Sequence, residues 1–339
     1  MDHFQRLFAQ WPLEQIVCVM HCCLMCACLA GFDTTQAQLG CKKLAGLLTG
    51  WETDTVQQLA CLTQLTYLSC KFGPHCGSWQ DLLQLPLLQS LEIREALTLK
   101  NVVTTFAQLQ SLTLNGHHEE ICNLESCTQL TELYIYIFAG NHFKTILLPA
   151  SSHVMLRTLG IWDRRCMHDH DFCLRHLSLV TQLERLYVGC QWLSNMGQVN
   201  LTVLPSLRQA NLSYPYSAMP ANLTFSTGLQ RLALKDYHLP SLPFWLSCMT
   251  QLRDLSIYHH KLDHFPESIL HLSQLYTLSL TGYNPAQQFL LSSRILCLAD
   301  WPNLTSCHLA TQGAGSQLLL HELRELLSVR NPTCKLYST

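Results

Sequence analysis

Charged residues are scarce in this sequence. Aspartate, glutamate, lysine and arginine together make up 13% of its 339 residues, where an ordinary soluble protein has about 25%. The formal net charge is −2, so no excess of positive charge would attract nucleic acid or an anionic membrane surface. We therefore expect no nucleic-acid partner and no membrane attachment through bulk charge.

The signatures of the common enzyme classes are also missing. The sequence has no glycine-rich phosphate loop, no Gly-x-Ser-x-Gly and no His-Glu-x-x-His. One polar segment, from Asp163 to Cys173, does alternate histidine and aspartate between His168 and Asp171. Such a loop could bind a metal if it folded round the ion, but we favour a solvated loop. The sequence thus predicts a protein that is not an enzyme and that has no metal site and no cofactor.

Leucine, by contrast, recurs in a regular phrase. Eleven times between Leu65 and Leu309 a leucine is followed three residues later by a second leucine, and two residues after that by another apolar residue. Only Ala210 and Cys307 replace the second leucine, and successive phrases begin 21 to 29 residues apart. Many phrases also have apolar residues three and six positions upstream, as Leu62 and Leu59 are upstream of Leu65. Each phrase predicts a short strand, and the upstream spacing predicts a return path that is helical or irregular.

On this phrase the chain resembles the leucine-rich repeat superfamily, strongly from about Thr55 to Thr311. The match is best from Leu239 to Asn284, where Leu242-Pro243 and Phe265-Pro266 look like the Leu-Pro type found in intracellular eukaryotic repeats. The resemblance implies an α/β repeat solenoid, a leucine-rich repeat horseshoe with a concave parallel β-sheet and a helical or irregular convex side. The asparagine that usually follows each strand in the family is essentially absent here, so we expect looser turns and uneven curvature.

The sequence predicts three parts. Residues 1–54 hold degenerate N-terminal repeats or an apolar leader, residues 55–315 form the leucine-rich repeat solenoid, and residues 316–339 form a C-terminal cap. In the cap, leucine spacing predicts a helix from Ser316 to Val329, stopped at Asn331-Pro332 and followed by a short strand at Cys334 to Tyr337.

The apolar stretch from Ile16 to Phe32 admits more than one interpretation. A signal peptide needs a positive start, whereas the residues before this stretch carry a net charge of −1. Its 17 residues just reach the length that spans a membrane. The sequence Phe-Ala-Gln-Trp-Pro-Leu at residues 8–13 resembles Leu-Ala-Asp-Trp-Pro-Asn-Leu at residues 298–304, with one residue missing. We therefore favour a degenerate first repeat over a signal or an anchor.

Cysteine usage bears on the cellular compartment. Of the 18 cysteines, Cys70, Cys127 and Cys307 occupy apolar slots of the repeat, where a buried thiol packs as a small hydrophobic group. The paired cysteine caps of many secreted relatives are not visible, so we expect a reduced, cytoplasmic protein. Four Asn-x-Ser/Thr sequons, at Asn200, Asn211, Asn222 and Asn303, would instead suit a secreted or membrane-anchored protein.

Side chains alternate along a strand, so the residues between the leucines should point to the concave face. Three consecutive repeats place an unusual cluster of aromatic and charged residues there, and a later repeat adds one more tyrosine. The predicted partner-binding residues are Glu132, Tyr134, Tyr136, Trp162, Arg185, Tyr187 and Tyr258. Aromatics with arginine are typical of interface hot spots, although tyrosine also simply favours strands.

We therefore expect a non-catalytic scaffold that recognises a protein partner through the concave face. Two alternatives stay open at this stage. One is a secreted or membrane-anchored leucine-rich repeat receptor ectodomain, and the other is the substrate-recognition subunit of a ubiquitin ligase.

Overall fold

The computed structural model describes sixteen stretches of the chain, which together hold the strands of all eleven phrases. They are residues 43–46, 65–71, 85–94, 108–116, 127–137, 145–147, 155–163, 173–175, 180–189, 200–213, 224–235, 241–260, 262, 264–282, 290–310 and 314–338. The chain divides into two compact units. The first unit is Met1–Leu156 with Phe172–Leu179, and the second unit is Arg157–Asp171 with Val180–Thr339.

The first unit contains a parallel sheet in which strands follow one another in chain order. Its strands are β1 (Lys43–Gly46), β2 (Tyr67–Lys71), β3 (Ser90–Arg94), β4 (Ser111–Gly116) and β5 (Glu132–Ile137). A second, separate pair of short parallel strands joins β6 (Thr145–Leu147) to β8 (Cys173–Arg175).

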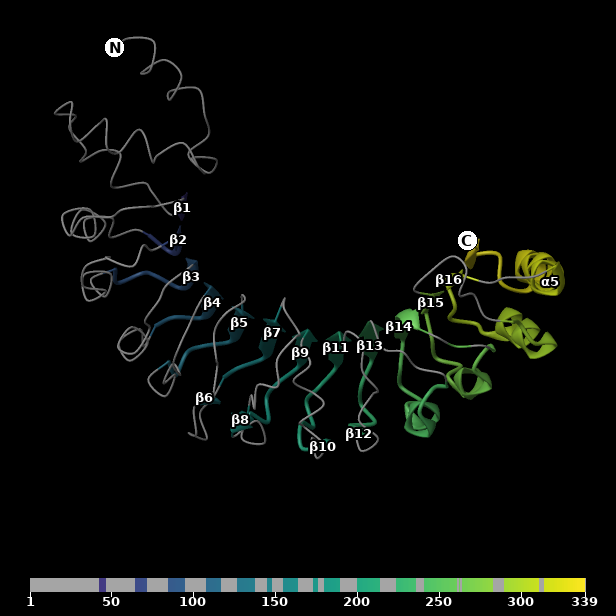
Figure 1. Ribbon diagram of the computed structural model, residues 1–339, viewed down its shortest axis with the longest axis horizontal. Helices are drawn as coiled ribbons and strands as arrows, with labels where there is room; N and C mark the ends of the chain where they lie inside the picture. Colours follow the sequence, from purple (N-terminus) through teal and green to yellow (C-terminus); the bar gives the residue numbers. More distant parts are fainter. Residues whose placement is uncertain are drawn as a thin grey trace, which may run out of the picture. The chain divides into compact units, whose positions relative to one another are not determined.

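The second unit repeats this plan over more strands. Its parallel sheet contains β7 (Thr158–Asp163), β9 (Arg185–Gly189), β11 (Gln209–Ser213), β13 (Arg231–Lys235), β14 (Asp254–His260), β15 (Thr277–Gly282), β16 (Ser306–Leu309) and β17 (Lys335–Ser338). The return paths begin with the short strand pair β10 (Asn200–Leu201) and β12 (Thr224–Phe225). They continue with the 3₁₀ helices η6 (Phe244–Cys248), η7 (Glu267–His271) and η8 (Ser293–Asp300), and with helix α5 (Ala314–Arg330). In Figure 1 the sheet of this unit lies on the inner side of a curved stack, and the helices lie on the outer side.

The leucine phrase forms the core in both units. No described phrase residue exposes more than 3% of its surface. Equivalent residues lie in register on neighbouring strands, so that Leu255 pairs with Leu232 on one side and with Leu278 on the other. Cys307 takes a leucine position and is fully buried as a free thiol. Stacking therefore turns eleven short strands, none of which could bury its leucines alone, into continuous apolar layers.

The apolar spacing of three has a direct structural cause. In η7 and its exit, the N–H of Ile269, Leu272 and Leu275 donates in turn to the carbonyl three residues earlier, at 3.0, 2.8 and 3.1 Å. A 3₁₀ turn has three residues, so every third side chain lies on the same side, and these three are fully buried. The predicted helical or irregular return path is thus a 3₁₀ ladder in these repeats.

Within each unit, most described repeats are also tied to the next by one main-chain carbonyl at the start of the strand. The carbonyl of Arg157 accepts hydrogen bonds from the N–H of both Glu184 and Arg185, at 2.8 and 2.9 Å. The same double acceptance recurs along both units, for instance at Arg208 and at Gln110. The residue just before each strand therefore has a fixed main-chain position whatever its side chain is.

The C-terminal elements pack on the last repeats. Helix α5 lies where the leucine spacing predicts a helix, and strand β17 pairs in parallel with β16. The buried Asn331 lies between them, and its amide donates to the carbonyls of Trp301 at 2.9 Å and Leu304 at 2.8 Å. One side chain thus satisfies two carbonyls at the end of the neighbouring repeat.

The structure confirms the predicted fold class, a leucine-rich repeat type of parallel β-solenoid with little α-helix. The division at residues 54 and 315 and the Leu-Pro subtype stay predictions. The stretch from Ile16 to Phe32 and most turns without asparagine lie outside the described residues. Within the described stretches, no helix is both long enough and apolar enough to cross a membrane.

Candidate functional site

The seven residues predicted to bind a partner fall in different units. Glu132, Tyr134 and Tyr136 lie on β5 of the first unit. Those in the second unit are Trp162 on β7, Arg185 and Tyr187 on β9, and Tyr258 on β14. All seven are partly or fully exposed. The grouping of three consecutive repeats into one surface stays a prediction, and the second unit offers a surface that can be described by itself.

Trp162 and Tyr187 form a stacked pair on the sheet of the second unit. Their ring centroids are 6.0 Å apart and their planes differ by 27°. In the register of β7 and β9, Trp162 lies opposite Gly189 and Tyr187 lies opposite Gly160. Each large ring therefore has a glycine beside it on the neighbouring strand, which leaves room for the two rings to meet diagonally.

Gly189 is required for this arrangement. A Cβ atom at that position would lie 2.6 Å from Cδ1 of the Trp162 indole, well inside an ordinary contact of 3.4 Å or more. The indole thus occupies the space that a side chain on β9 would fill. We call Trp162 and Tyr187 the aromatic pair, and Gly189 is the glycine that makes room for it.

Tyr258 is not part of the aromatic pair. Two strands, β11 and β13, lie between β9 and β14 in the sheet, so Tyr258 is about 14 Å from the strand of Tyr187 at about 4.8 Å per strand. Small, partly exposed side chains cover the sheet between them, namely Asn211, Ala233 and Ser256. In the row of Tyr258, however, the exposed Lys235 lies directly opposite that tyrosine on β13, so the sheet face between the aromatic residues is small along the row of Tyr187 and charged next to Tyr258.

A second feature of this unit was not predicted from the sequence. Five arginines occur at the amino-terminal ends of five adjacent strands: Arg157, Arg185, Arg208, Arg231 and Arg253. We call them the arginine row. Three of them directly precede a strand and two begin one. The signal is present in the sequence, because an arginine lies one or two residues before the middle position of each of five consecutive phrases. The apolar pattern that defines the phrase does not include those positions.

In the first unit, the charged residue Glu92 on the sheet face is hydrogen-bonded within the sheet. The carboxylate of Glu92 accepts hydrogen bonds from the Tyr67 hydroxyl at 3.0 Å and from the Ser69 hydroxyl at 2.9 Å. Both donors come from the neighbouring strand β2. Glu92 is therefore bound within its own sheet rather than presented for a ligand.

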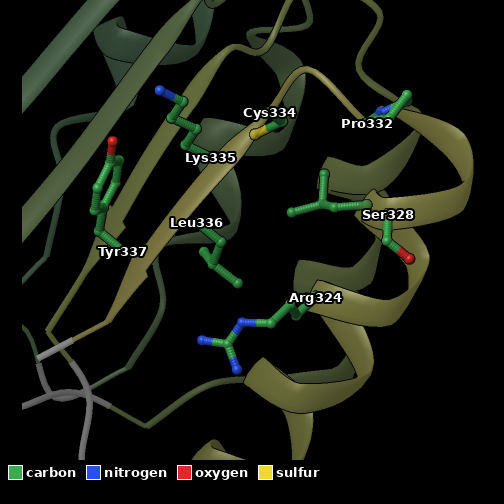
Figure 2. A pocket seen from close by; sticks show the side chains of 8 residues that line it. Arg324, Ser328, Pro332, Cys334, Lys335, Leu336 and Tyr337 are labelled. Carbon is green, nitrogen blue, oxygen red and sulfur yellow. The ribbon is translucent and has the colours of Figure 1, made fainter.

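A hollow of about 400 Å³ lies between α5 and β17 (Figure 2). Arg324 and Ser328 reach it from the helix, and Leu336 and Cys334 line it from the strand side. Burial raises the pKa of the Cys334 thiol, which disfavours the thiolate that a nucleophile needs.

Metal-ligating residues do not gather in the described part of the chain. No group of three or more histidine, cysteine, aspartate or glutamate side chains there could hold an ion. The histidine and aspartate cluster from His168 to Asp171 lies outside the described residues. Its interpretation as a solvated loop stays a prediction.

Comparison of the sequence with protein-family models and with curated proteins gave no match. Solved structures do match. The internalin InlF of Listeria monocytogenes is similar over 88% of this chain and 82% of its own, with 19% sequence identity and a TM-score of 0.53.

Two further solved structures are similar at lower scores. A leucine-rich repeat protein of Leptospira interrogans is 17% identical over 88% of this chain and 90% of its own, with a TM-score of 0.39. TLR13, in its complex with ssRNA13, is 16% identical over 80% of this chain and 43% of its own, with a TM-score of 0.49.

The internalin match concerns the fold, and it agrees with the phrase in the sequence and with the stacked parallel strands. Within each unit the phrases bury their leucines in register, and the described helices of the second unit lie on the other side of its sheet (Figure 1). This chain therefore has the leucine-rich repeat fold.

Proposed function

We propose that this protein is a non-catalytic scaffold that binds a protein partner through the sheet face of its second unit. The observation that carries the proposal is the stacked pair of Trp162 and Tyr187, which Gly189 accommodates on an exposed sheet. Interface hot spots are enriched in tryptophan, tyrosine and arginine. Repeat solenoids in general bind partners on the extended concave surface that stacking creates.

The fold supplies what such a surface needs. The strands are held by a core that is closed to water and by a carbonyl that accepts two hydrogen bonds in each repeat. The positions of the aromatic rings are therefore set before any partner arrives. Preorganised side chains lose less conformational entropy on binding, which favours affinity.

The test is loss of partner capture from the native host. The variant Trp162→Ala with Tyr187→Ala should reduce capture by at least about tenfold, since hot-spot truncations cost about 2 kcal/mol or more. Phe244→Ala is the matched control, because this ring is 84% exposed on η6, on the opposite side of the sheet. Undiminished capture by the double variant, or equal losses with Phe244→Ala, would refute the proposal.

We also propose that the protein works in a reducing compartment, the cytoplasm. Support comes from Cys307, a fully buried free thiol in a leucine position, and from Cys248, Cys297 and Cys334, which are free as well. A secreted protein seldom keeps several thiols reduced. Intact-mass measurement of protein from the native host should show no disulfides and no glycan at Asn303; a glycan or disulfides would favour the secreted alternative.

A further inference from the structure

The arginine row concentrates positive charge in a chain that has almost no net charge. Two carboxylates offset part of it: Glu184 lies 3.5 Å from Arg157, and Asp254 lies 3.0 Å from Arg231. In the part of the chain that the structure describes, no carboxylate pairs with the other three arginines. The two-residue turns before β9, β11, β13 and β14, at 181–182, 205–206, 227–228 and 250–251, carry no charge either.

The fold does not require arginine at these positions. The equivalent residues at the strand starts of the first unit are Thr66, Tyr67, Gln89, Ser90, Gln110, Ser111, Thr131 and Glu132. After β14 they are Tyr276, Thr277, Thr305, Ser306, Cys334 and Lys335. What each repeat needs there is a main-chain carbonyl, which any residue supplies. The row is therefore an addition to the repeat and not a consequence of it.

The head groups of two arginines of the row make contacts within the unit. A guanidinium Nη1 of Arg208 donates to the carbonyl of Gly228 at 3.1 Å. The guanidinium of Arg253 lies 5.8 Å from the centroid of the Tyr276 ring, within the range of a cation–π contact. A guanidinium that is already positioned loses less freedom when it binds a carboxylate. These contacts leave further N–H donors of each guanidinium for a ligand.

We propose that the arginine row binds an extended acidic segment of the protein partner, whose carboxylates pair with Arg185, Arg208 and Arg253. This inference rests on the proposed function, because the row begins on the strands that carry Trp162 and Tyr187. It crosses four strand spacings, about 19 Å, which matches about six residues of an extended chain at about 3.3 Å each. The guanidinium fork fits carboxylates in a bidentate manner.

The charges favour a peptide over a nucleic acid. A nucleic-acid backbone carries a negative charge at every nucleotide, so a strand laid along the row would pass over Glu184 and Asp254 as well as over the arginines. A peptide carries its carboxylates on flexible side chains, which can turn away from those two points and toward the arginines. Rejection of the wrong partner by like charges is a common source of specificity.

The experiment uses the full chain and a fluorescent hexaglutamate peptide at low ionic strength. The variant Arg185→Gln, Arg208→Gln, Arg253→Gln should weaken peptide binding by at least about tenfold, since three charge-assisted contacts are lost. Its matched control is Arg294→Gln, Arg324→Gln, Arg330→Gln, which removes the same charge from exposed positions of η8 and α5. That control should bind hexaglutamate as the unmodified chain does.

Gly228→Ala keeps every charge and tests geometry alone. A Cβ atom at this glycine would collide with the Arg208 guanidinium, so the head group must leave its place. Binding of hexaglutamate should weaken, by less than in the triple variant. The variant requires no change of core packing, and its thermal unfolding should match that of the unmodified chain.

Several outcomes would overturn the inference. They are no hexaglutamate binding, equal loss in the two triple variants, or tighter binding of hexathymidylate with the same arginine dependence, which would indicate a nucleic acid. Failure here is separable from failure of the proposed function. If capture of the native partner needs Trp162 and Tyr187 but survives loss of the three arginines, the scaffold proposal stands and the acidic segment does not.

Discussion

The exchange Gly189→Ala probes the aromatic pair with a single methyl group. The new Cβ would lie 2.6 Å from Cδ1 of Trp162, where at least 3.4 Å is normal, so the indole must retreat by about 0.8 Å. The ring is rigid, and its retreat weakens the stack with Tyr187, which as a whole contributes about 0.5–1.5 kcal/mol. Against this, alanine is more favourable than glycine within a strand by about 0.5–1 kcal/mol.

The two effects nearly cancel in the free energy of unfolding, which should change by less than about 1 kcal/mol. The affinity for the partner should nevertheless fall. Displacing a hot-spot side chain costs about 2 kcal/mol, or roughly 30-fold in Kd. The prediction is therefore a folded protein of nearly normal stability that has lost most of its binding.

Near-ultraviolet circular dichroism measures the environment of the Trp162 indole directly. The difference spectrum between the unmodified chain and Trp162→Phe gives the signal of the stacked indole, and Gly189→Ala should lose most of it. Gly315→Ala is the control, since nothing lies within 4 Å of a Cβ there. An unchanged spectrum with unchanged affinity in Gly189→Ala would refute the argument that Gly189 makes room for the ring.

Three further predictions concern the repeat stack. Leu255→Ala should lower the free energy of unfolding by about 2.7–5 kcal/mol in urea titrations, because the side chain is fully buried between two in-register leucines, whereas Leu318→Ala at 68% exposure should change it by less than about 0.5 kcal/mol. Asn331→Ala should cost about 1–3 kcal/mol, because the buried Leu304 carbonyl would lose its donor and the Trp301 carbonyl would keep only the Leu304 N–H at 3.3 Å; a neutral effect would show that water replaces the amide. Burial raises the pKa of Cys307, so its thiol stays protonated in the folded state while it ionises in the unfolded one, and stability should fall above about pH 8.5 by up to about 1.4 kcal/mol per pH unit. Cys307→Val should flatten that slope, and an equal slope in this variant would exclude Cys307 as its source.

The strands could be predicted because burial in a stacked sheet requires apolar residues at the same positions of every repeat. Each described phrase residue is buried, and the sheet-face positions counted from the phrase lie in register, as Tyr187, Asn211 and Ala233 do. The pairing is parallel, and the distance between phrases is fixed by the return path. Repeat counting alone therefore places a residue on its strand and on its face.

The return paths could be predicted only in part. Apolar spacing of three indicated helix or irregular chain, and the structure shows 3₁₀ turns after Pro243 and Pro266 but a pair of short strands at Asn200–Leu201 and Thr224–Phe225. A strand pair depends on the neighbouring repeat as well as on its own residues. No single repeat therefore contains the information that selects between the two.

The candidate site, too, could be predicted from the sequence only in part. The closeness of Trp162 and Tyr187 follows from adjacent strands, and the distance of Tyr258 follows from counting the strands between. The role of Gly189 could not be predicted, because it depends on the side-chain rotamer of Trp162. Of the arginine row only Arg185 could be predicted as a site residue, because the other four arginines gain meaning only when the strands are aligned side by side.

Photo-crosslinking from defined positions of the second unit tests most directly whether its sheet face binds the partner. A benzophenone amino acid at Ala233, a partly exposed position on β13, should join the partner covalently in the native host. The same group at Phe244, on η6, should not. Crosslinks from Phe244 alone, or equal yields from both positions, would contradict the account.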